Sequence, residues 1–313
     1  MANEPAVIKA PDVINAGPSA INNDQAVAKD TPFVSVRNLT IGYGDRIVQQ
    51  NLNFDIKRND IFFIIGGSGT GKTTLLKSMI GLLPPSQGET LYALDNKTAD
   101  INFYNADENT QLDLLKNWGI TYQSGALLSS MSLAENVALP LQLYTDLSEK
   151  QIAETVAYKL ALVGLSGFET FYPAELSGGM HKRAGLARAL ALDPKLLFFD
   201  EPSAGLDPIS SLRLDQLIVQ ICQALDSTVI IVSHELPSIL TIGTNSVVLD
   251  AETKTMLDSG DPKELVKNSK ADKVRQFLNR EEGSTTKSAS TDATRDAKKT
   301  ESTADKNNEE KKA

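Results

Sequence analysis

The chain has 313 residues, of which 41% are hydrophobic and 23% are charged, and its formal net charge is −9. An acidic chain argues against a nucleic-acid surface as the main partner, because such surfaces carry clustered Lys and Arg. The single cysteine, Cys222, excludes an internal disulfide, and its apolar neighbours at helical spacing predict a buried structural thiol. No basic segment followed by an apolar stretch opens the chain, and no apolar run approaches membrane-spanning length, so neither a signal peptide nor a membrane span is expected.

The two ends differ in composition from the middle. Residues 1–31 are rich in Ala, Asn, Asp and Pro, and residues 281–313 are almost entirely polar or charged. Such segments bury too little apolar surface to offset chain entropy, so both are predicted to be disordered. One folded domain is then expected over about residues 32–280.

The folded part begins with predicted antiparallel strands. Residues 33–41 and 47–56 read as strands, with turns at 42–45 and 58–60. Tyr43, in the first turn, is either an ordinary turn residue or an aromatic side chain that stacks on a bound base. An antiparallel β layer therefore precedes the next segment.

That segment fits the phosphate-loop pattern G-x-x-x-x-G-K-[ST] at every fixed position. It reads Gly66, Gly67, Ser68, Gly69, Thr70, Gly71, Lys72 and Thr73. An unbroken apolar run, 61–65, predicts a buried parallel strand before it, and residues 74–80 have helical spacing after it. Glycines let backbone N–H groups converge on phosphate oxygens, and the helix start adds partial positive charge. We expect Lys72 to reach the β- and γ-phosphates of a nucleotide and Thr73 to hold Mg²⁺.

The middle of the chain reads as a strand, a polar stretch and then helices. Residues 88–94 alternate, a short helix is expected at 113–116, and a strand over 118–122 ends at Gln123. Residues 131–192 are predicted to be mostly helical, with a first helix interrupted by Pro140 and a second, 151–163, capped by Ser148. Residues 176–180 open a further helix. Ser177 and two glycines at its start leave N–H groups available to an anion.

Two more buried strands end in polar residues. Residues 196–199 lead into Asp200 and Glu201, and residues 228–232 lead into Ser233 and His234. The acidic pair is either a solvated turn or part of a site, and the carboxyl ends of strands are where α/β sheets bind ligands. His181 is expected to be exposed. A helix over 211–224, a closing hairpin over 247–260 and helices beginning at 261 and 273 complete the domain.

Taken together, these motifs resemble those of the ATPase subunit of an ABC transporter. The resemblance covers about residues 33–280 and rests on the phosphate loop, Gln123 and His234 and on segments 176–180, 196–201 and 203–207. It implies an α/β fold of the ABC nucleotide-binding type. Such a domain has a RecA-like parallel core, an antiparallel β layer and a helical subdomain, here over about residues 124–192.

The resemblance also implies roles for particular residues. Glu201 becomes the catalytic base and His234 the γ-phosphate sensor, with Lys72 and Gln123 completing the catalytic set. The implied Mg²⁺ ligands are Thr73, Gln123 and Asp200. The implied ATP-binding residues are Tyr43 on the adenine, the phosphate loop Gly66, Gly67, Ser68, Gly69, Thr70, Gly71, Lys72 and Thr73, then Thr74, and the signature residues Ser177, Gly178 and Gly179. Asp207 becomes the loop residue that faces a second copy.

Two positions depart from the usual family pattern. The signature ends in Met180 where Gln is usual, and the phosphate loop has Gly67 where Pro is common. Neither change removes a group that does chemistry. The Met-ended signature with its basic neighbours, together with segments 123–128, 135–141 and 274–278, is similar to the ATPase of MCE-type lipid transporters, the Mla system.

The narrower resemblance implies a function and a set of partners. We expect two copies to sandwich two ATP molecules and to energise phospholipid transport between the membranes of a Gram-negative bacterium, which maintains outer-membrane lipid asymmetry. The expected partners are a multi-spanning permease docking at about residues 123–141, an MCE-type periplasmic lipid-binding subunit and a small cytoplasmic accessory subunit. The chain is then peripheral at the cytoplasmic face of the inner membrane. The alternatives are a soluble ABC ATPase without transport and the ATPase of a metabolite importer.

Overall fold

A computed structural model of the chain describes residues 31–94, 99–123 and 125–279. The predicted disordered tails, 1–31 and 281–313, therefore lie almost wholly outside the described residues. Within the described part, no helix is long and apolar enough to cross a membrane.

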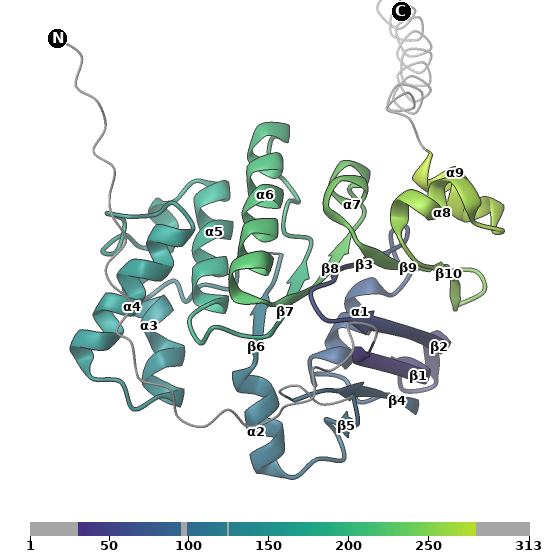
Figure 1. Ribbon diagram of the computed structural model, residues 1–313, viewed down its shortest axis with the longest axis horizontal. Helices are drawn as coiled ribbons and strands as arrows, with labels where there is room; N and C mark the ends of the chain where they lie inside the picture. The colour runs from purple at the N-terminus through teal and green to yellow at the C-terminus, as the bar shows by residue number, and fades with distance from the viewer. Residues whose placement is uncertain (1–30, 95–98, 124, 280–313) are drawn as a thin grey trace, which may run out of the picture.

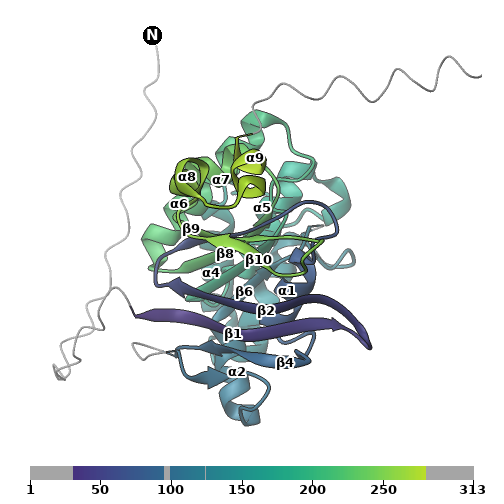
Figure 2. The ribbon, with the colours of Figure 1, turned by 90° about the vertical axis from the view of Figure 1, so that its right-hand side faces the viewer.

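The first layer is a four-stranded antiparallel sheet, which lies below the core in Figure 2. Its order is β2-β1-β4-β5, made from Arg46–Lys57, Pro32–Tyr43, Gln87–Tyr92 and Ile101–Asn102. The predicted strands at 33–41 and 47–56 are therefore confirmed and pair directly. The two-residue β5 was not predicted, since it is too short to show an alternating pattern.

The second layer is a six-stranded sheet of order β10-β9-β3-β8-β7-β6. Neighbouring strands from β9 to β6 are parallel, and β10 closes the edge in the antiparallel sense. The strands are β3 (Ile61–Ile65), β6 (Trp118–Thr121), β7 (Leu196–Asp200), β8 (Thr228–Ser233), β9 (Asn245–Leu249) and β10 (Met256–Ser259). The three predicted buried strands thus lie side by side at the centre.

Alternating side chains of the central strands serve two hydrophobic cores. Phe62 and Ile64 of β3 face the core shared with the antiparallel sheet and with α1 (Lys72–Met79). Phe63 and Ile65 face the opposite core, which α6 (Pro208–Leu225) and α7 (Leu236–Ile242) cover. Since every residue of β3 is buried, its continuous apolar run is explained by burial on both faces.

Three helices form one side of the molecule, at the left of Figure 1. They are α3 (Leu133–Tyr144), α4 (Glu149–Leu162) and α5 (Gly178–Ala189). Ser148 caps α4 as predicted, in a capping box with Gln151. The interruption expected at Pro140 is wrong, because α3 continues through it to Tyr144. The remaining helices are α2 (Glu108–Lys116), which begins five residues before its predicted start, α8 (Pro262–Asn268) and α9 (Asp272–Leu278).

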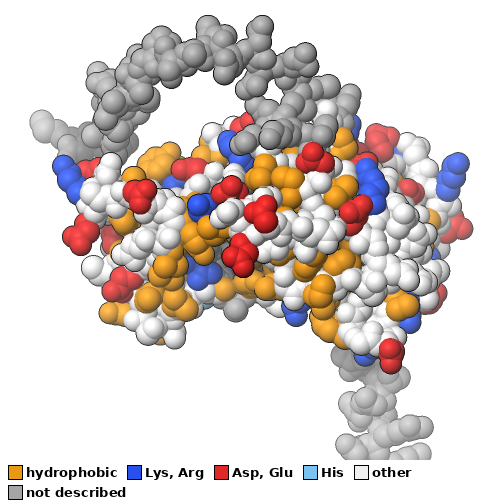
Figure 3. Space-filling view, turned by 90° about the horizontal axis from the view of Figure 1, so that it is seen from below, with side chains coloured by type: hydrophobic (Ala, Val, Ile, Leu, Met, Phe, Trp, Pro, Cys, Tyr) orange, Lys and Arg blue, Asp and Glu red, His pale blue; other side chains and the backbone are white. Residues whose placement is uncertain are grey.

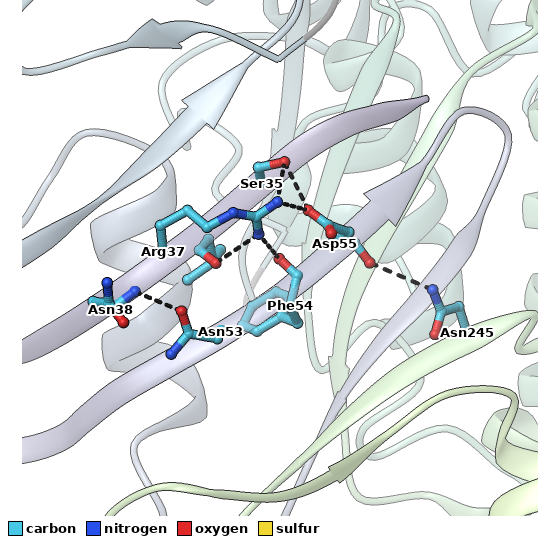
Figure 4. A network of polar contacts seen from close by, with 8 residues as sticks. Ser35, Arg37, Asn38, Asn53, Phe54, Asp55 and Asn245 are labelled. Atoms are coloured by element: carbon cyan, nitrogen blue, oxygen red, sulfur yellow. Dashed lines mark hydrogen bonds and ion pairs between the residues drawn. The ribbon is translucent and has the colours of Figure 1, made fainter. Parts of the chain in front are cut away.

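A polar network joins the two sheets (Figure 4). Arg37 pairs with Asp55 at 2.6 Å, and the Ser35 hydroxyl donates to the same carboxylate at 2.7 Å. The Asn245 side chain at the start of β9 donates to the Asp55 carbonyl at 3.5 Å and to Asp60 at 3.2 Å. These contacts tie the antiparallel sheet to the edge of the core, and hence to the strand that leads into the phosphate loop.

Apolar side chains reach the surface in several groups among charges on the face that Figure 3 shows. Leu112 and Leu115 of α2, the helix at the bottom of Figure 1, are 36% and 40% exposed. Exposed apolar side chains are ordinary in folded domains, so these two leucines identify no site by themselves.

Candidate functional site

The turn between β3 and α1 is shaped by close backbone approaches. A Cβ on Gly66 would lie 2.6 Å from Thr70 Oγ1 and 2.9 Å from the Leu249 carbonyl oxygen. Gly71 has φ +91° and a Cβ there would lie 2.5 Å from a methyl carbon of Val48. Only glycine fits either position without a shift of its neighbours, so the loop backbone is held tightly against β2 and β9.

Lys72 is buried at the start of α1. Its Nζ donates to the Gly66 carbonyl at 2.9 Å and to the Gly67 carbonyl at 3.0 Å. Burial lowers the pKa of Lys72, while the nearby Glu201 and Asp200 carboxylates oppose that shift. A buried cation beside a turn that presents backbone N–H groups suits a multiply charged anion such as a phosphate chain.

Oxygen ligands gather on the other side of the turn. The Thr73 hydroxyl donates to Asp200 Oδ1 at 3.2 Å, where β7 ends. Asp200 is 8% exposed, and burial raises its pKa above the usual value. A hydroxyl and a desolvated carboxylate are the donor set that Mg²⁺ prefers, and a divalent ion there would reverse the effect of burial on Asp200. The residues present therefore fit a magnesium ion.

Glu201 follows Asp200 in an uncommon backbone conformation, with φ +50°. Its Oε1 lies 2.8 Å from Nδ1 of His234, which comes directly after β8. Its Oε2 is buried, and no hydrogen-bond partner for it is found among the described residues. A carboxylate oxygen that is desolvated and unpaired costs free energy unless a water or ligand meets it, so this atom points to a bound group.

These groups share one cavity. Its volume is about 580 Å³, and its lining is Gly67, Ser68, Gly69, Lys72, Thr73, Gln123, Asp200, Glu201, His234, Leu236 and Phe277. A second cavity of about 390 Å³ adjoins it through Gly69, Lys72 and Thr73. Tyr43, which is 51% exposed, lines the second cavity together with Thr74. The second cavity thus extends the first from the phosphate loop to Tyr43.

The predicted signature residues lie elsewhere. Ser177 caps α5, and its hydroxyl accepts from the Met180 N–H at 3.4 Å. Ser177, Gly178, Gly179 and Asp207 line a separate cavity of about 560 Å³ between α5 and α6. Hydrogen bonds from Ser210 lower the pKa of Asp207, which caps α6. Within one chain, the signature residues therefore do not lie at the cavity that the phosphate loop lines.

The structure adds one residue to this site and corrects the placement of another. The ammonium of Lys182 donates to the Glu201 carbonyl at 3.0 Å, a contact that no sequence motif indicated. His181, predicted to be exposed, is half-buried, because its ring packs against Gly125, where a Cβ would lie 2.7 Å from Nδ1. Burial lowers its pKa, and the charge of Lys182 adds to that effect.

Cys222 is buried as predicted. Its Sγ donates to the Ser227 carbonyl at 2.8 Å. Burial raises the pKa of the thiol to about 11, so it is not a reactive thiolate at neutral pH.

Comparisons with known proteins agree with this geometry. The family model described as ABC transporter matches residues 49–204. The chain is 41% identical over 246 residues to the intermembrane phospholipid transport system ATP-binding protein MlaF of Haemophilus influenzae, covering 79% of this chain and 90% of that protein. It is 38% identical over 255 residues to MlaF of Escherichia coli K12, covering 82% and 90%.

Further relatives and solved structures extend the comparison. The probable ribonucleotide transport ATP-binding protein mkl of Mycobacterium leprae is 41% identical over 246 residues, a match that spans 68% of that protein. Its Mycobacterium tuberculosis counterpart is 40% identical, and the match spans 66% of its length. The structure of cbiO1 from Clostridium perfringens, part of an ABC transporter complex, superposes with TM-score 0.67 at 29% identity over 76% of this chain and 92% of that one.

A second solved structure holds reaction products. It is a dimeric ATP-binding cassette in a post-hydrolysis state bound to ADP and Pi, with TM-score 0.63 and 26% identity over 73% of this chain and 98% of that one. The expected fold class is thereby confirmed. The chain belongs to the ABC transporter family, as one of its ATP-hydrolysing subunits.

Proposed function

We propose that this chain hydrolyses ATP to energise phospholipid transport between the inner and outer membranes of a Gram-negative bacterium, and so maintains outer-membrane lipid asymmetry. The MlaF relatives, which this chain matches over 90% of their length, support the choice of substrate. The observation that carries the chemistry is the buried Oε2 of Glu201, which lies beside Lys72 and Asp200 and has no hydrogen-bond partner among the residues that the structure describes.

We assign the following roles to the site residues. Lys72 and the loop N–H groups bind the β- and γ-phosphates, and Thr73, Gln123 and Asp200 hold Mg²⁺. The metal ion, when bound, neutralises charge on the phosphate oxygens. Tyr43 and Thr74 lie on the nucleotide side of the loop, with Tyr43 against the adenine. In this arrangement phosphoryl transfer is catalysed mainly by positioning and charge.

Glu201 acts on the attacking water in this proposal. Its Oε2 accepts a hydrogen bond from the water and takes a proton as the oxygen attacks the γ-phosphorus. The bond to the bridging oxygen then breaks, and ADP and inorganic phosphate leave. His234 holds Oε1 at 2.8 Å, which fixes the carboxylate and leaves the imidazole close to the γ-phosphate.

A second copy completes each site. Ser177, Gly178 and Gly179 of one chain contact the nucleotide bound by the other, and Asp207 lies at the same interface. The dimeric ABC cassettes among the similar structures support a dimer. Hydrolysis then changes the affinity of the two copies, which converts phosphate chemistry into movement.

Membrane partners bind outside the nucleotide site. We place the permease contact on the segment after Gln123, about residues 123–141, where Leu128 is 41% exposed and Leu127 and Met131 are half-buried. The complex includes a multi-spanning permease, an MCE-type periplasmic lipid-binding subunit and a small cytoplasmic accessory subunit. The chain then lies at the cytoplasmic face of the inner membrane, with its domain at residues 32–280 and its helical subdomain at about 124–192.

The ATPase chemistry is tested with Glu201→Gln. The amide keeps the size of the side chain but cannot accept the proton, so kcat should fall on the order of 100-fold or more, while ATP still binds. ATP turnover and nucleotide affinity are measured on the full chain. Turnover near the unsubstituted rate would show that Glu201 is not the base.

The transport assignment is tested by gentle solubilisation of membranes and affinity capture of this chain. A multi-spanning permease with an MCE-type protein and bound phospholipid is the expected result. A permease with a soluble binding protein would instead support the metabolite-importer alternative. Recovery of no membrane protein would favour a soluble ABC ATPase, with the ATP chemistry unchanged.

A further inference from the structure

Glu201 is held in place by its backbone as much as by its side chain. Its N–H donates to the Val232 carbonyl of β8 at 2.9 Å, and its carbonyl accepts from the Ala204 N–H at 3.2 Å. The φ of +50° between these two contacts is energetically costly for a residue with a side chain. Such a conformation persists only where several contacts hold it. Each hydrogen bond to the backbone of Glu201 therefore affects the direction in which its carboxylate points.

Lys182 supplies a further contact to this peptide, and it does so from a different element. Its ammonium donates to the Glu201 carbonyl at 3.0 Å from the second turn of α5. The side chain lines a small, mostly apolar cavity with Leu186, Phe199 and Leu214. Burial lowers the pKa of Lys182, and the Glu235 and Glu201 carboxylates oppose that shift. A cationic donor in a partly desolvated place makes a stronger hydrogen bond than an exposed lysine does.

We propose that Lys182 is a positioning residue for ATP hydrolysis: its contact with the Glu201 carbonyl holds that residue in the left-handed conformation that turns the carboxylate into the cavity. Lys182 does not line the cavity that holds Lys72 and Asp200, so it acts through Glu201 and not on the nucleotide. This inference rests on the proposed role of Glu201.

The contact also connects two halves of the mechanism within one chain. The helix that carries Lys182 is capped by Ser177, and this end of the helix faces the second copy in the proposed dimer. Farther along α5, the Arg188 guanidinium donates to the Ala126 carbonyl at 2.5 Å, in the segment after Gln123. The helix α5 therefore contacts both Glu201 and the segment after Gln123 in the same chain.

The chain contains a matched control for this contact. Lys195 directly precedes β7, at the opposite end from Glu201, and its ammonium donates to the Leu225 carbonyl at 3.2 Å. Lys182→Met and Lys195→Met each remove one lysine-to-carbonyl hydrogen bond beside the same strand. Only Lys182 contacts the residue that is proposed as the catalytic base.

The test compares kcat, KM for ATP and melting temperature in the full-length chain. Lys182→Met should lower kcat by about 10- to 100-fold, the effect of losing one charged hydrogen bond, with KM and melting temperature nearly unchanged. Lys182→Arg keeps a cationic donor and should recover most of the lost kcat. Lys195→Met should leave kcat unchanged.

Two results would overturn the proposal. One is a kcat for Lys182→Met within about twofold of the unsubstituted chain. The other is a loss of kcat that comes with a lower melting temperature and is not reversed by Lys182→Arg, since that pattern indicates a structural role. Glu201→Gln separates this failure from failure of the proposed function: a normal Lys182→Met beside an inactive Glu201→Gln rejects only the positioning role.

Discussion

Two helices of this domain begin with small residues, and their starts differ in what surrounds them. At the start of α1, Gly66 and Lys72 are buried, and Lys72 closes back onto the loop carbonyls. At the start of α5, Ser177 and Gly178 are exposed, and a Cβ on Gly178 would meet nothing within 4 Å among the described residues. The first start is complete within one chain, and the second faces open space.

The difference shows how the same feature, a helix start that presents N–H groups, serves two purposes. Both starts present N–H groups that favour an anion. The first also carries a cation, a hydroxyl and nearby carboxylates, so it can hold a nucleotide by itself. The second offers the Ser177 hydroxyl and backbone N–H groups, with no lysine or carboxylate in its first turn, which suits a group that another molecule brings. A substitution at each start can therefore separate nucleotide binding from assembly.

The largest effect is expected for Lys72→Ala. Removing the buried cation takes away the charge that faces the β- and γ-phosphates, so ATP affinity should fall by more than about 100-fold and turnover should be abolished. The control is Lys77→Ala on the exposed face of the same helix, which should change neither quantity. Binding of a fluorescent ATP analogue and phosphate release measure the two effects. Normal hydrolysis by Lys72→Ala would contradict the role given to this residue.

Gly178→Asp should abolish the function of the α5 start without lowering the stability of the chain. The position has room for a side chain, and a carboxylate is favourable in the first turn of a helix, so the melting temperature should not fall. A single chain should still bind ATP, but the new negative charge repels the phosphates that the second copy brings. Turnover should fall by about 100-fold, and ATP-dependent dimerisation, measured by light scattering, should be lost.

The comparison would fail if Gly178→Asp lowered the affinity of the monomeric chain for ATP as strongly as Lys72→Ala does. That result would place both helix starts at the same nucleotide within one chain.

A smaller and more selective effect is expected at Leu128. This side chain is 41% exposed in the segment after Gln123, outside the three cavities that hold the predicted ATP residues. Leu128→Glu should leave the ATPase activity of the isolated chain within about twofold, because it removes no group of the site. In reconstituted membranes it should uncouple hydrolysis from phospholipid movement. Unchanged assembly and transport would exclude this segment as the permease contact.

Most of the fold could be predicted because its signals are local. The runs 61–65 and 196–199 are apolar throughout, 228–232 is apolar after Thr228, and each proved to be a strand buried on both faces. Caps such as Ser148 fixed helix starts to within a residue or two. The short β5 and the path of α3 through Pro140 could not be predicted, because neighbours elsewhere in the chain stabilise them and override local preference.

The site divides in the same way. The sequence motifs predicted which side chains meet at the ends of β3, β7 and β8, since parallel strands bring their carboxyl ends to one edge. They did not predict the contact between Lys182 and the Glu201 carbonyl, because a lysine that binds a backbone carbonyl leaves no residue pattern at the acceptor. The half-burial of His181 against Gly125 depends on the same packing of α5.

The smallest effect is expected at the start of α4. This helix start is a reference for the other two, because no ligand is proposed to bind there. At α4, the Ser148 hydroxyl accepts from the Gln151 N–H at 3.4 Å, and Gln151 Oε1 accepts from the Ser148 N–H at 2.9 Å. Ser148→Ala leaves one helix N–H without its partner, so the free energy of unfolding should fall by about 1 kcal/mol and the melting temperature by about 2–4 °C. ATP turnover below the melting transition should be unchanged, since this cap lies outside the three cavities that hold the predicted ATP residues. Calorimetry beside a turnover assay measures the two quantities. A fall in turnover without a fall in stability would mean that the start of α4, like that of α5, takes part in the catalytic cycle.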